Sequence, residues 1–191
     1  MAATYHIAQY NVARMRAPLD DPIMEGFCSR LDELNHLGDR SPGFVWRFHT
    51  EDGTSTSVRP YPDDPLVVIN MTVCESIEAL HAFTYRSDHG PMYAARHTWF
   101  EPMTNAPDPS LTPEPPLPAG GARQREHGSI SMGHTLVLWW VQAGYTPDPS
   151  QGKVRLELLR RRGPSPNAFT MKQHFPPPDR RLPFDGSAVS L

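Results

Sequence analysis

The chain has 191 residues, a formal net charge of −3 and two cysteines, which fits one domain that folds without a disulfide framework or a structural metal. It contains no apolar run of about 18 residues and no secretion signal, so we expect a soluble, cytoplasmic protein without a membrane partner. The absence of a basic stripe argues against nucleic acid as a partner. Cys28 and Cys74 lie within apolar patterns, so both are predicted to be buried thiols.

The first predicted elements are a strand and a helix. Residues 5–12 mix aromatic and β-branched side chains, which is typical of a strand. The sequence Asp20-Asp21-Pro22 predicts the start of a helix, with proline in its first turn. Apolar residues from Ile23 to Leu37 then recur at spacings of three and four, and Gly38 ends the pattern.

Two further strands are predicted before the middle of the chain. In residues 44–48 the alternation places Phe44, Trp46 and Phe48 on one face of a strand. Residues 66–73 are an almost continuous apolar run, as in a central strand. We expect these two strands to be antiparallel neighbours joined by a long polar loop.

Two helices and a proline-rich segment follow. Ser76 is a predicted N-cap, and Glu75 and Glu78 add negative charge near the start of that helix. A second helix is predicted from about Ser87, with Pro91 in its first turn. Seven of the residues from 102 to 118 are prolines, so residues 103–133 are predicted to form an irregular insertion.

The last predicted elements are a strand at 135–141, a helix at 153–162 and a strand at 168–172. The whole order predicts an α+β fold, in which a split βαβ core forms an antiparallel sheet. We expect a single domain over residues 1–175 and an extended C-terminal tail over residues 176–191.

One helical segment combines aromatic, cationic and titratable residues. Tyr93, Arg96, His97 and Phe100 are spaced as on one helical face, which fits a pocket wall with an anion-binding arginine and a proton-transferring imidazole. An ordinary amphipathic helix fits the same spacing. His89 and His97 would lie ~12 Å apart along a helix, too far to share a metal ion. The spacing leaves a single haem-ligating histidine open.

Two other groups of residues could line a ligand site. Trp139 and Trp140 are adjacent in a strand, so one should face the helices and the other an open sheet face. Asn11, Arg14 and Arg16 lie at the end of the first strand, and Trp46 and Arg47 lie on the second. They could orient a polar ligand, or they could simply be solvated at the ends of strands.

Several stretches together resemble the family catalogued as domain of unknown function 3291. They are AQYNVAR (8–14), PLDDP (18–22), RSPGFVWR (40–47), VCESIEAL (73–80), FTYRS (83–87), RHTWF (96–100), LWWV (138–141) and GPSPNAFT (163–170). The resemblance covers about residues 5–175 outside the insertion. It implies a ferredoxin-like antiparallel sheet with helices on one face, paired in a homodimer as a dimeric α+β barrel. The long insertion and Gln142, where proline is expected, depart from the family pattern.

The superfamily implied by this resemblance contains small monooxygenases and haem proteins. The leading prediction is therefore a biosynthetic or tailoring enzyme, similar to cofactor-independent monooxygenases, cyclases or isomerases, that acts on an apolar metabolite. A non-catalytic ligand-binding or stress-associated protein and a haem-binding barrel are the alternatives. The predicted catalytic residues are His97, Arg96 and His89, and no metal or cofactor is required. The predicted substrate-binding residues are Asn11, Arg14, Trp46, Tyr85, Tyr93, Trp99 and Trp140.

Overall fold

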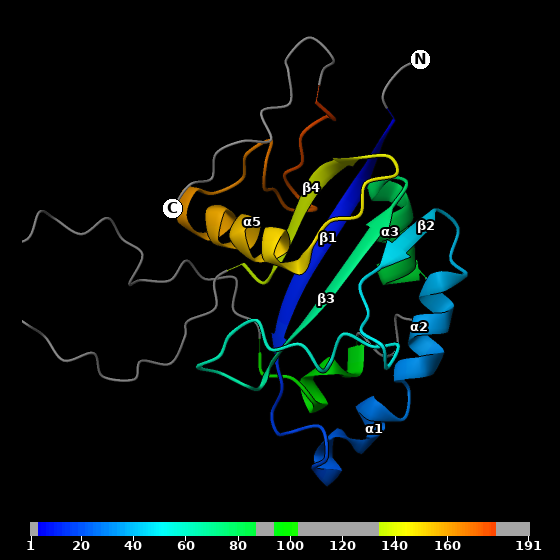
Figure 1. Cartoon of the computed structure of the whole chain (residues 1–191), viewed down its shortest axis with the longest axis vertical. Helices are drawn as coiled ribbons and strands as arrows, with labels where there is room; N and C mark the ends of the chain where they lie inside the picture. The colour runs from blue at the N-terminus through cyan, green and yellow to red at the C-terminus, as the bar shows by residue number, and fades with distance from the viewer. Residues whose placement is uncertain (1–3, 87–93, 103–133, 179–191) are drawn as a thin grey trace, which may run out of the picture.

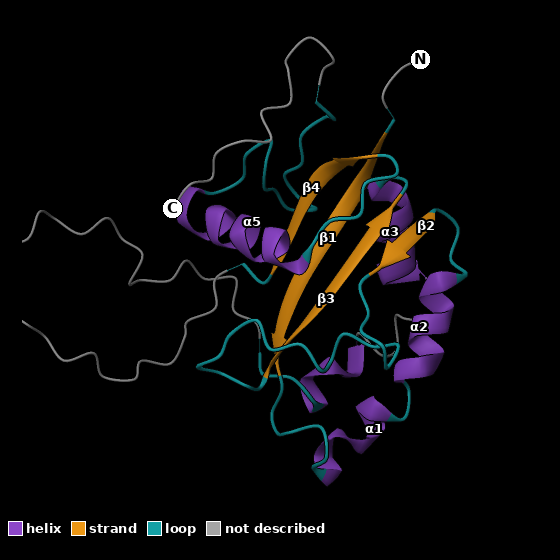
Figure 2. Cartoon of the chain, in the orientation of Figure 1, coloured by secondary structure: helices purple, strands orange, loops and turns teal. Residues whose placement is uncertain are grey.

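The computed structural model describes residues 4–86, 94–102 and 134–178. Its centre is a four-stranded antiparallel sheet in the order β2-β3-β1-β4 (Figures 1 and 2). The strands are β1 (Tyr5–Arg14), β2 (Phe44–Arg47), β3 (Val67–Cys74) and β4 (Leu136–Gln142). The helices are α1 (Glu25–Cys28), α2 (Leu31–Asp39), α3 (Ile77–Arg86) and α5 (Pro149–Arg162), with 3-10 turns η1 (Pro22–Met24) and η2 (Arg96–Thr98).

The register of the sheet fixes which side chains share a face. On β1, Ala8 lies opposite Val73 of β3 and Trp139 of β4, whereas the next residue, Gln9, lies opposite Thr72 and Leu138. Because successive side chains of a strand point to opposite faces, these two rows belong to different faces. The antiparallel α+β prediction is confirmed, as is the pairing of β2 with β3.

The first face is covered by α5, and we call it the closed face. Its buried side chains come from alternate positions of β1, β3 and β4 and meet Leu156 and Leu159 of the helix. Gly152 allows close contact, since a Cβ atom there would lie 2.5 Å from Cγ of Tyr10. Trp46 and Phe48 pack against the same cluster from the β2 side. The strand residues of this face are Ala8, Tyr10, Val12, Val67, Ile69, Met71, Val73, Val137, Trp139 and Val141.

Helix α5 begins four residues before the predicted start at 153, and its N-terminus explains why. The Asp148 side chain accepts a hydrogen bond from Ser150 N, and Gln151 completes a capping box with Asp148. Pro149 occupies the first helical turn, where its missing N–H costs nothing. The cap therefore fixes the start of the helix more firmly than its apolar pattern does.

The second face, which we call the mixed face, is apolar only at its two ends. At one end Ile7, Cys74 and Leu138 pack with Leu80 of α3. At the other end Val68 packs with Met15, Met24 and Trp99. The prediction that helices cover one face of the sheet is therefore wrong, because α3 contacts the mixed face and α5 the closed face (Figure 1).

The structure corrects the predicted faces of β2. Phe44 lies opposite Cys74, but Trp46 lies opposite Val73, because the register shifts between Phe44 and Trp46. Phe44 therefore points to the mixed face, and Trp46 points to the closed face with Phe48. A β-bulge adds one residue to a strand and reverses the alternation beyond it, which a strict period of two cannot anticipate.

The predicted strand at 168–172 is also wrong. In this segment Phe169 forms only an isolated bridge with Leu138, with two hydrogen bonds of 2.8 and 2.9 Å. Phe169 and Phe175 pack beside Trp140, whose Nε1 donates to Phe175 O at 2.8 Å. The two tryptophans do point to opposite faces, as predicted, but neither faces an open part of the sheet.

Two predicted helices differ from the structure. The helix expected from Asp21 to Leu37 is divided into η1, α1 and α2, and Ile23, placed on its apolar face, is 46% exposed. Residues 94–95 are helical, but Arg96–Thr98 form a 3-10 turn, and Phe100 beyond it forms a bridge with Met15. The predicted helix start near Ser87 and Pro91 lies outside the described residues, as does the insertion at 103–133.

The two thiols are both free, and they differ in environment. Cys74 is buried as predicted, whereas Cys28 is half-buried and donates its S–H to Leu19 O. Burial raises the pKa of the Cys74 thiol to about 11, with a smaller contribution from Glu75. Of the helices within the described ranges, none combines the length and the apolar character that crossing a membrane requires.

Candidate functional site

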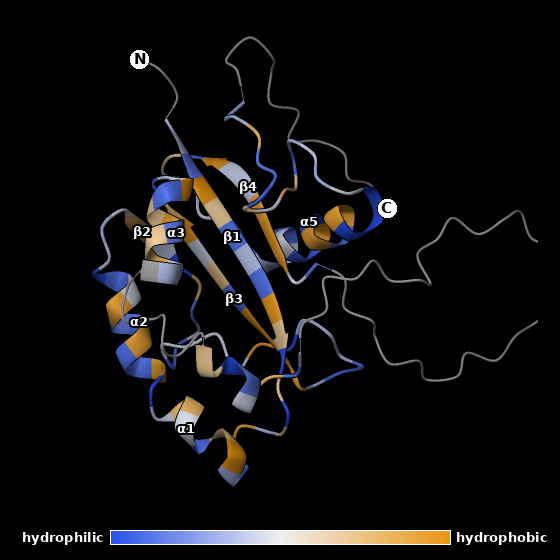
Figure 3. Ribbon diagram, turned by 180° about the vertical axis from the view of Figure 1, so that it is seen from behind, coloured by the Kyte–Doolittle hydropathy of each residue, from blue (hydrophilic) through white to orange (hydrophobic). Residues whose placement is uncertain are grey.

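Four polar side chains lie together in the middle of the mixed face. Gln9 and Asn11 come from β1, and Thr72 and Asn70 are their direct partners on β3. Gln9 and Asn11 are two positions apart on β1, and so are Asn70 and Thr72 on β3. All four side chains therefore project on the same side of the sheet. We call these four residues the polar quartet. Figure 3, which views the molecule from behind, shows the hydrophilic middle of β1 between more hydrophobic segments.

Three members of the quartet form a directed chain of hydrogen bonds. Thr72 Oγ1 donates to Gln9 Oε1 at 2.7 Å, and Gln9 Nε2 donates to Asn11 Oδ1. The chain ends at Asn11, whose Nδ2 makes no hydrogen bond with a described residue. The Asn70 side chain also makes none within the described ranges.

Exposure increases along the quartet. Gln9 and Thr72 are 8% and 7% exposed, Asn11 is half-buried, and Asn70 is exposed. Some side-chain atoms of the described residues, such as Tyr10 Oη, are fully buried and make no hydrogen bond. Asn11 Nδ2 is not one of these atoms, so it keeps contact with solvent. Asn70 is exposed between Ile69 and Met71, which are 3% and 1% exposed; it is paired with Asn11 on β1, whereas the pairing of β3 with β2 ends before it, at Thr72 and Met71.

The surroundings of the quartet combine apolar walls with one paired charge. On the β4 side, Leu136 and Leu138 are the partners of Asn11 and Gln9. On the β2 side, Arg47 is the partner of Thr72, and its Nε donates to Asp39 Oδ1 at 2.8 Å. Its Nη1 donates to Gly53 O at 2.8 Å. The arginine nearest in the sheet is therefore committed to protein partners.

The sequence carried a signal for this site that the prediction missed. Residues 66–73 were interpreted as an almost uninterrupted apolar run, but Asn70 and Thr72 occur two positions apart within it. Gln9 and Asn11 show the same spacing in the first strand, where only Asn11 was selected as a candidate. Polar residues at alternate positions of two strands indicate a polar strip on one face, although pairing of the strips requires the register.

The predicted catalytic residues lie apart from the quartet in sequence and in secondary structure. Arg96 and His97 are exposed on η2, where His97 Nδ1 is 3.0 Å from Ala94 O. Trp99, which follows them, is buried at the apolar end of the mixed face with Met15 and Met24. His89 lies outside the described residues, so the predicted catalytic group stays a prediction.

The structure also separates the predicted substrate-binding residues. Asn11 belongs to the quartet, whereas Trp46 lies on the closed face. Arg14 bonds to Asp64 at 2.8 Å and to Glu101, and the hydrogen bond with Asp64 is the main cause that raises its pKa. Tyr85 is 49% exposed on α3 beside His81, with ring centroids 4.7 Å apart. Of the remaining candidates, Trp99 and Trp140 pack at the two ends of the mixed face and Tyr93 lies outside the described residues.

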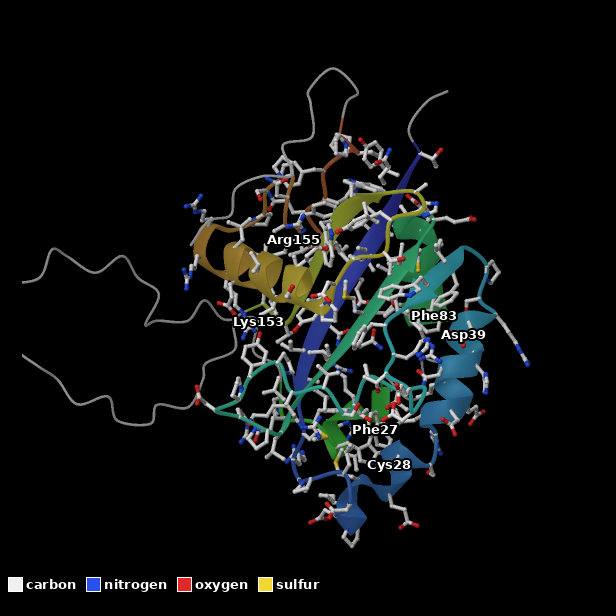
Figure 4. All side chains as sticks on the ribbon, viewed as in Figure 1. Phe27, Cys28, Asp39, Phe83, Lys153 and Arg155 are labelled. Atoms are coloured by element: carbon white, nitrogen blue, oxygen red, sulfur yellow. The ribbon has the colours of Figure 1, made fainter. Side chains whose placement is uncertain are left out.

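No group of three or more His, Cys, Asp or Glu side chains suited to a metal ion occurs in residues 4–86, 94–102 and 134–178. Figure 4 shows the side chains of the described residues and labels Lys153 and Arg155 on α5, Asp39 on α2 and Phe83 on α3. What the quartet offers chemically is therefore neutral hydrogen bonding by amides and a hydroxyl.

Comparison with known proteins identifies the family. No curated protein matches the chain, and no solved structure matches it either. The model of the family described as Domain of unknown function (DUF3291) matches residues 6–108 and 121–184, a span that includes all four residues of the quartet. The chain belongs to this family of domains of unknown function.

Proposed function

We propose that the protein binds a small organic molecule on the mixed face of its sheet, over the polar quartet. The observation that carries this proposal is the exposed side chain of Asn70 near the middle of β3, which makes no hydrogen bond with a described residue. The buried members of the quartet, Gln9 and Thr72, are paired as buried polar groups need to be, whereas Asn11 and Asn70 keep hydrogen-bonding groups in contact with solvent. A polar strip with free hydrogen-bonding groups between two apolar ends has the composition usual for a small-molecule site.

An enzymatic role is the further part of the proposal. The quartet contains no group that titrates near neutral pH, so it could hold and orient a substrate but could not transfer its protons. Proton transfer would have to come from a group such as His97, while Arg96 would hold an anionic oxygen. The position of η2 supports this role, because Trp99, which follows η2, packs at one end of the mixed face. A monooxygenase-, cyclase- or isomerase-like reaction is compatible with this division of roles.

The finer fold assignment is proposed on the same basis. A ferredoxin-like sheet is supported by the strand order β2-β3-β1-β4, by antiparallel pairing throughout and by helices after β1 and β3. A homodimer follows from the family resemblance, and Val45, 40% exposed on edge strand β2, is an apolar position at which a second copy could pair. Light scattering should then give twice the chain mass of 21.5 kDa.

The binding proposal is tested with a fragment screen on three proteins. The Asn70→Leu variant places an apolar side chain on the quartet, and Gln142→Leu makes the same change at another exposed strand position. We expect a group of fragments to bind the wild type and Gln142→Leu but not Asn70→Leu. Fragments that bind all three proteins equally, or an absence of binding to the wild type, would contradict the proposal.

A further inference from the structure

The quartet has a direction, and the direction selects the chemistry of its ligand. Each hydrogen bond in the chain uses a donor of one residue and an acceptor of the next, from Thr72 through Gln9 to Asn11. The Oδ1 atom of Asn11 is occupied by Gln9, so the capacity left at the end of the chain is the N–H donors of Nδ2. Hydrogen bonds in series polarise one another, which strengthens this terminal donor.

Asn70 adds the complementary groups on the next strand. Its Cα is the direct partner of Asn11, so the two amides project side by side from the same face. No described residue forms a hydrogen bond with the Asn70 side chain, which has one acceptor oxygen and two N–H donors. A group that bridges Asn11 and Asn70 can therefore accept from the first residue and both accept from and donate to the second.

The charges beside the quartet do not favour an ionic ligand. Arg47 is held by Asp39 and by Gly53 O, and that ion pair is neutral as a whole. Arg14, at the far end of β1, is the partner of Val67 in the row of the closed face and is shared between two carboxylates, Asp64 and Glu101. An anion at the quartet would find no uncommitted cation in these two groups, and an ammonium group would face the N–H donors of Asn11.

From these observations we infer that the quartet recognises an uncharged carbonyl group that carries a neighbouring N–H, as in a carboxamide or a lactam, attached to an apolar body. The carbonyl oxygen accepts from Asn11 Nδ2, and the N–H donates to the Asn70 side-chain oxygen. The apolar body lies toward Leu136, the half-buried partner of Asn11 on β4. This inference rests on the proposed binding function and adds the chemical class of the ligand.

The test compares three probes that share one ring: benzamide, benzoate and benzylamine. Each is titrated into the full chain labelled with nitrogen-15, and the side-chain amide signals of Asn11 and Asn70 are followed. The signals are assigned from their loss in the Asn11→Asp and Asn70→Leu variants. We expect benzamide to shift both signals with a dissociation constant on the order of 1 mM, as the size of the probe allows. Benzoate should bind at least about tenfold more weakly because its charge would lose hydration with no uncommitted cation to replace it, and benzylamine because its ammonium offers no acceptor to Asn11 Nδ2.

Asn11→Asp gives a sharper readout because it replaces the terminal donor by a charged acceptor of the same shape. The dissociation constant of benzamide should rise at least about tenfold, and benzylamine should bind most tightly of the three probes. Gln142→Leu serves as the control and should keep the wild-type order.

The outcomes distinguish the inferred ligand class from the proposed binding function. If benzoate or benzylamine binds the wild type as well as benzamide does, the inferred ligand class is wrong and the binding function stands. If none of the three probes shifts Asn11 or Asn70, the proposed function fails as well. Should Asn11→Asp not fold, the order of the three probes on the wild type decides the inference alone.

Discussion

The closed face and the mixed face are built from alternate residues of the same strands, yet their centres differ. In the centre of the closed face, Tyr10 and Met71 are 0% and 1% exposed and lie beneath α5. In the centre of the mixed face, Asn11 and Asn70 take the equivalent positions, and Asn70 is exposed. Helices contact both faces, so the difference lies in the side chains at the centre.

This difference separates stability from recognition. The closed face gains the usual benefit of apolar burial, roughly 25 cal/mol for each Å² removed from water. The centre of the mixed face forgoes that gain, and Asn11 Nδ2 and the Asn70 side chain there make no hydrogen bond with a described residue. We therefore expect substitutions on the closed face to change the free energy of unfolding, and substitutions at Asn70 to change binding.

The largest effect is expected for Leu156→Ala. Leu156 is 0% exposed between α5 and the sheet, so its truncation should lower the free energy of unfolding by about 3 kcal/mol. Val154→Ala on the same helix is the control, because Val154 is 40% exposed and should change stability by less than about 0.5 kcal/mol. Urea unfolding of both variants measures the contrast, and equal losses would mean that α5 does not close this face as described.

Gly152→Ala should have the next largest effect. A methyl group at Gly152 would overlap the Tyr10 ring, with Cγ at 2.5 Å, so α5 must move away from the sheet. Overpacking of this kind costs about 2 kcal/mol. In Gly38→Ala the nearest atom is Phe83 Cζ at 3.5 Å, an ordinary contact, and the substitution should be neutral or stabilising. Thermal unfolding that ranks Gly38→Ala as the worse variant would contradict the close packing of α5.

Asp148→Ala tests the cap that holds α5 over the closed face. Loss of the cap should cost about 1 kcal/mol, and Asp148→Asn should retain most of that stability, since asparagine also caps helices. Hydrogen bonds from Ser150 lower the pKa of Asp148. Its ionised form therefore stabilises the protein above the unfolded-state pKa of about 3.9, and this contribution disappears as the pH falls through the lower folded-state pKa. The difference in the free energy of unfolding between the wild type and Asp148→Asn should therefore shrink as the pH falls. A difference that grows in acid would contradict this expectation.

Thiol reactivity should show that the mixed face is closed at its α3 end. Cys74 lies there with Leu80, and its thiol pKa is raised to about 11, so little reactive thiolate exists at neutral pH. Modification of the native protein with a disulfide reagent should therefore reach half-buried Cys28 before Cys74. The Cys28→Ser variant should react only after unfolding, and fast reaction of its native form would show that this end of the face is open.

Local patterns were sufficient to predict most of the sheet but not the site. The sequence predicts β1, β2, β3 and β4 close to their observed positions, because apolar and β-branched runs are strong local signals. The bulge in β2 and the packing of α5 on the closed face depend on contacts distant in sequence, which single segments do not encode. The quartet was missed for the same reason: Asn70 and Asn11 are 59 positions apart, and only the register of β1 with β3 makes them neighbours.

The most direct test of the contrast between the two faces is the free energy of unfolding of Asn70→Leu, measured in urea. If the amide at this position serves recognition, a leucine in its place loses no hydrogen bond and favours the strand, so stability should be unchanged or higher by up to about 1 kcal/mol. The same variant should lose fragment binding. A loss of stability above about 1 kcal/mol would show that Asn70 supports the fold, and it would contradict the assignment of the mixed face to binding.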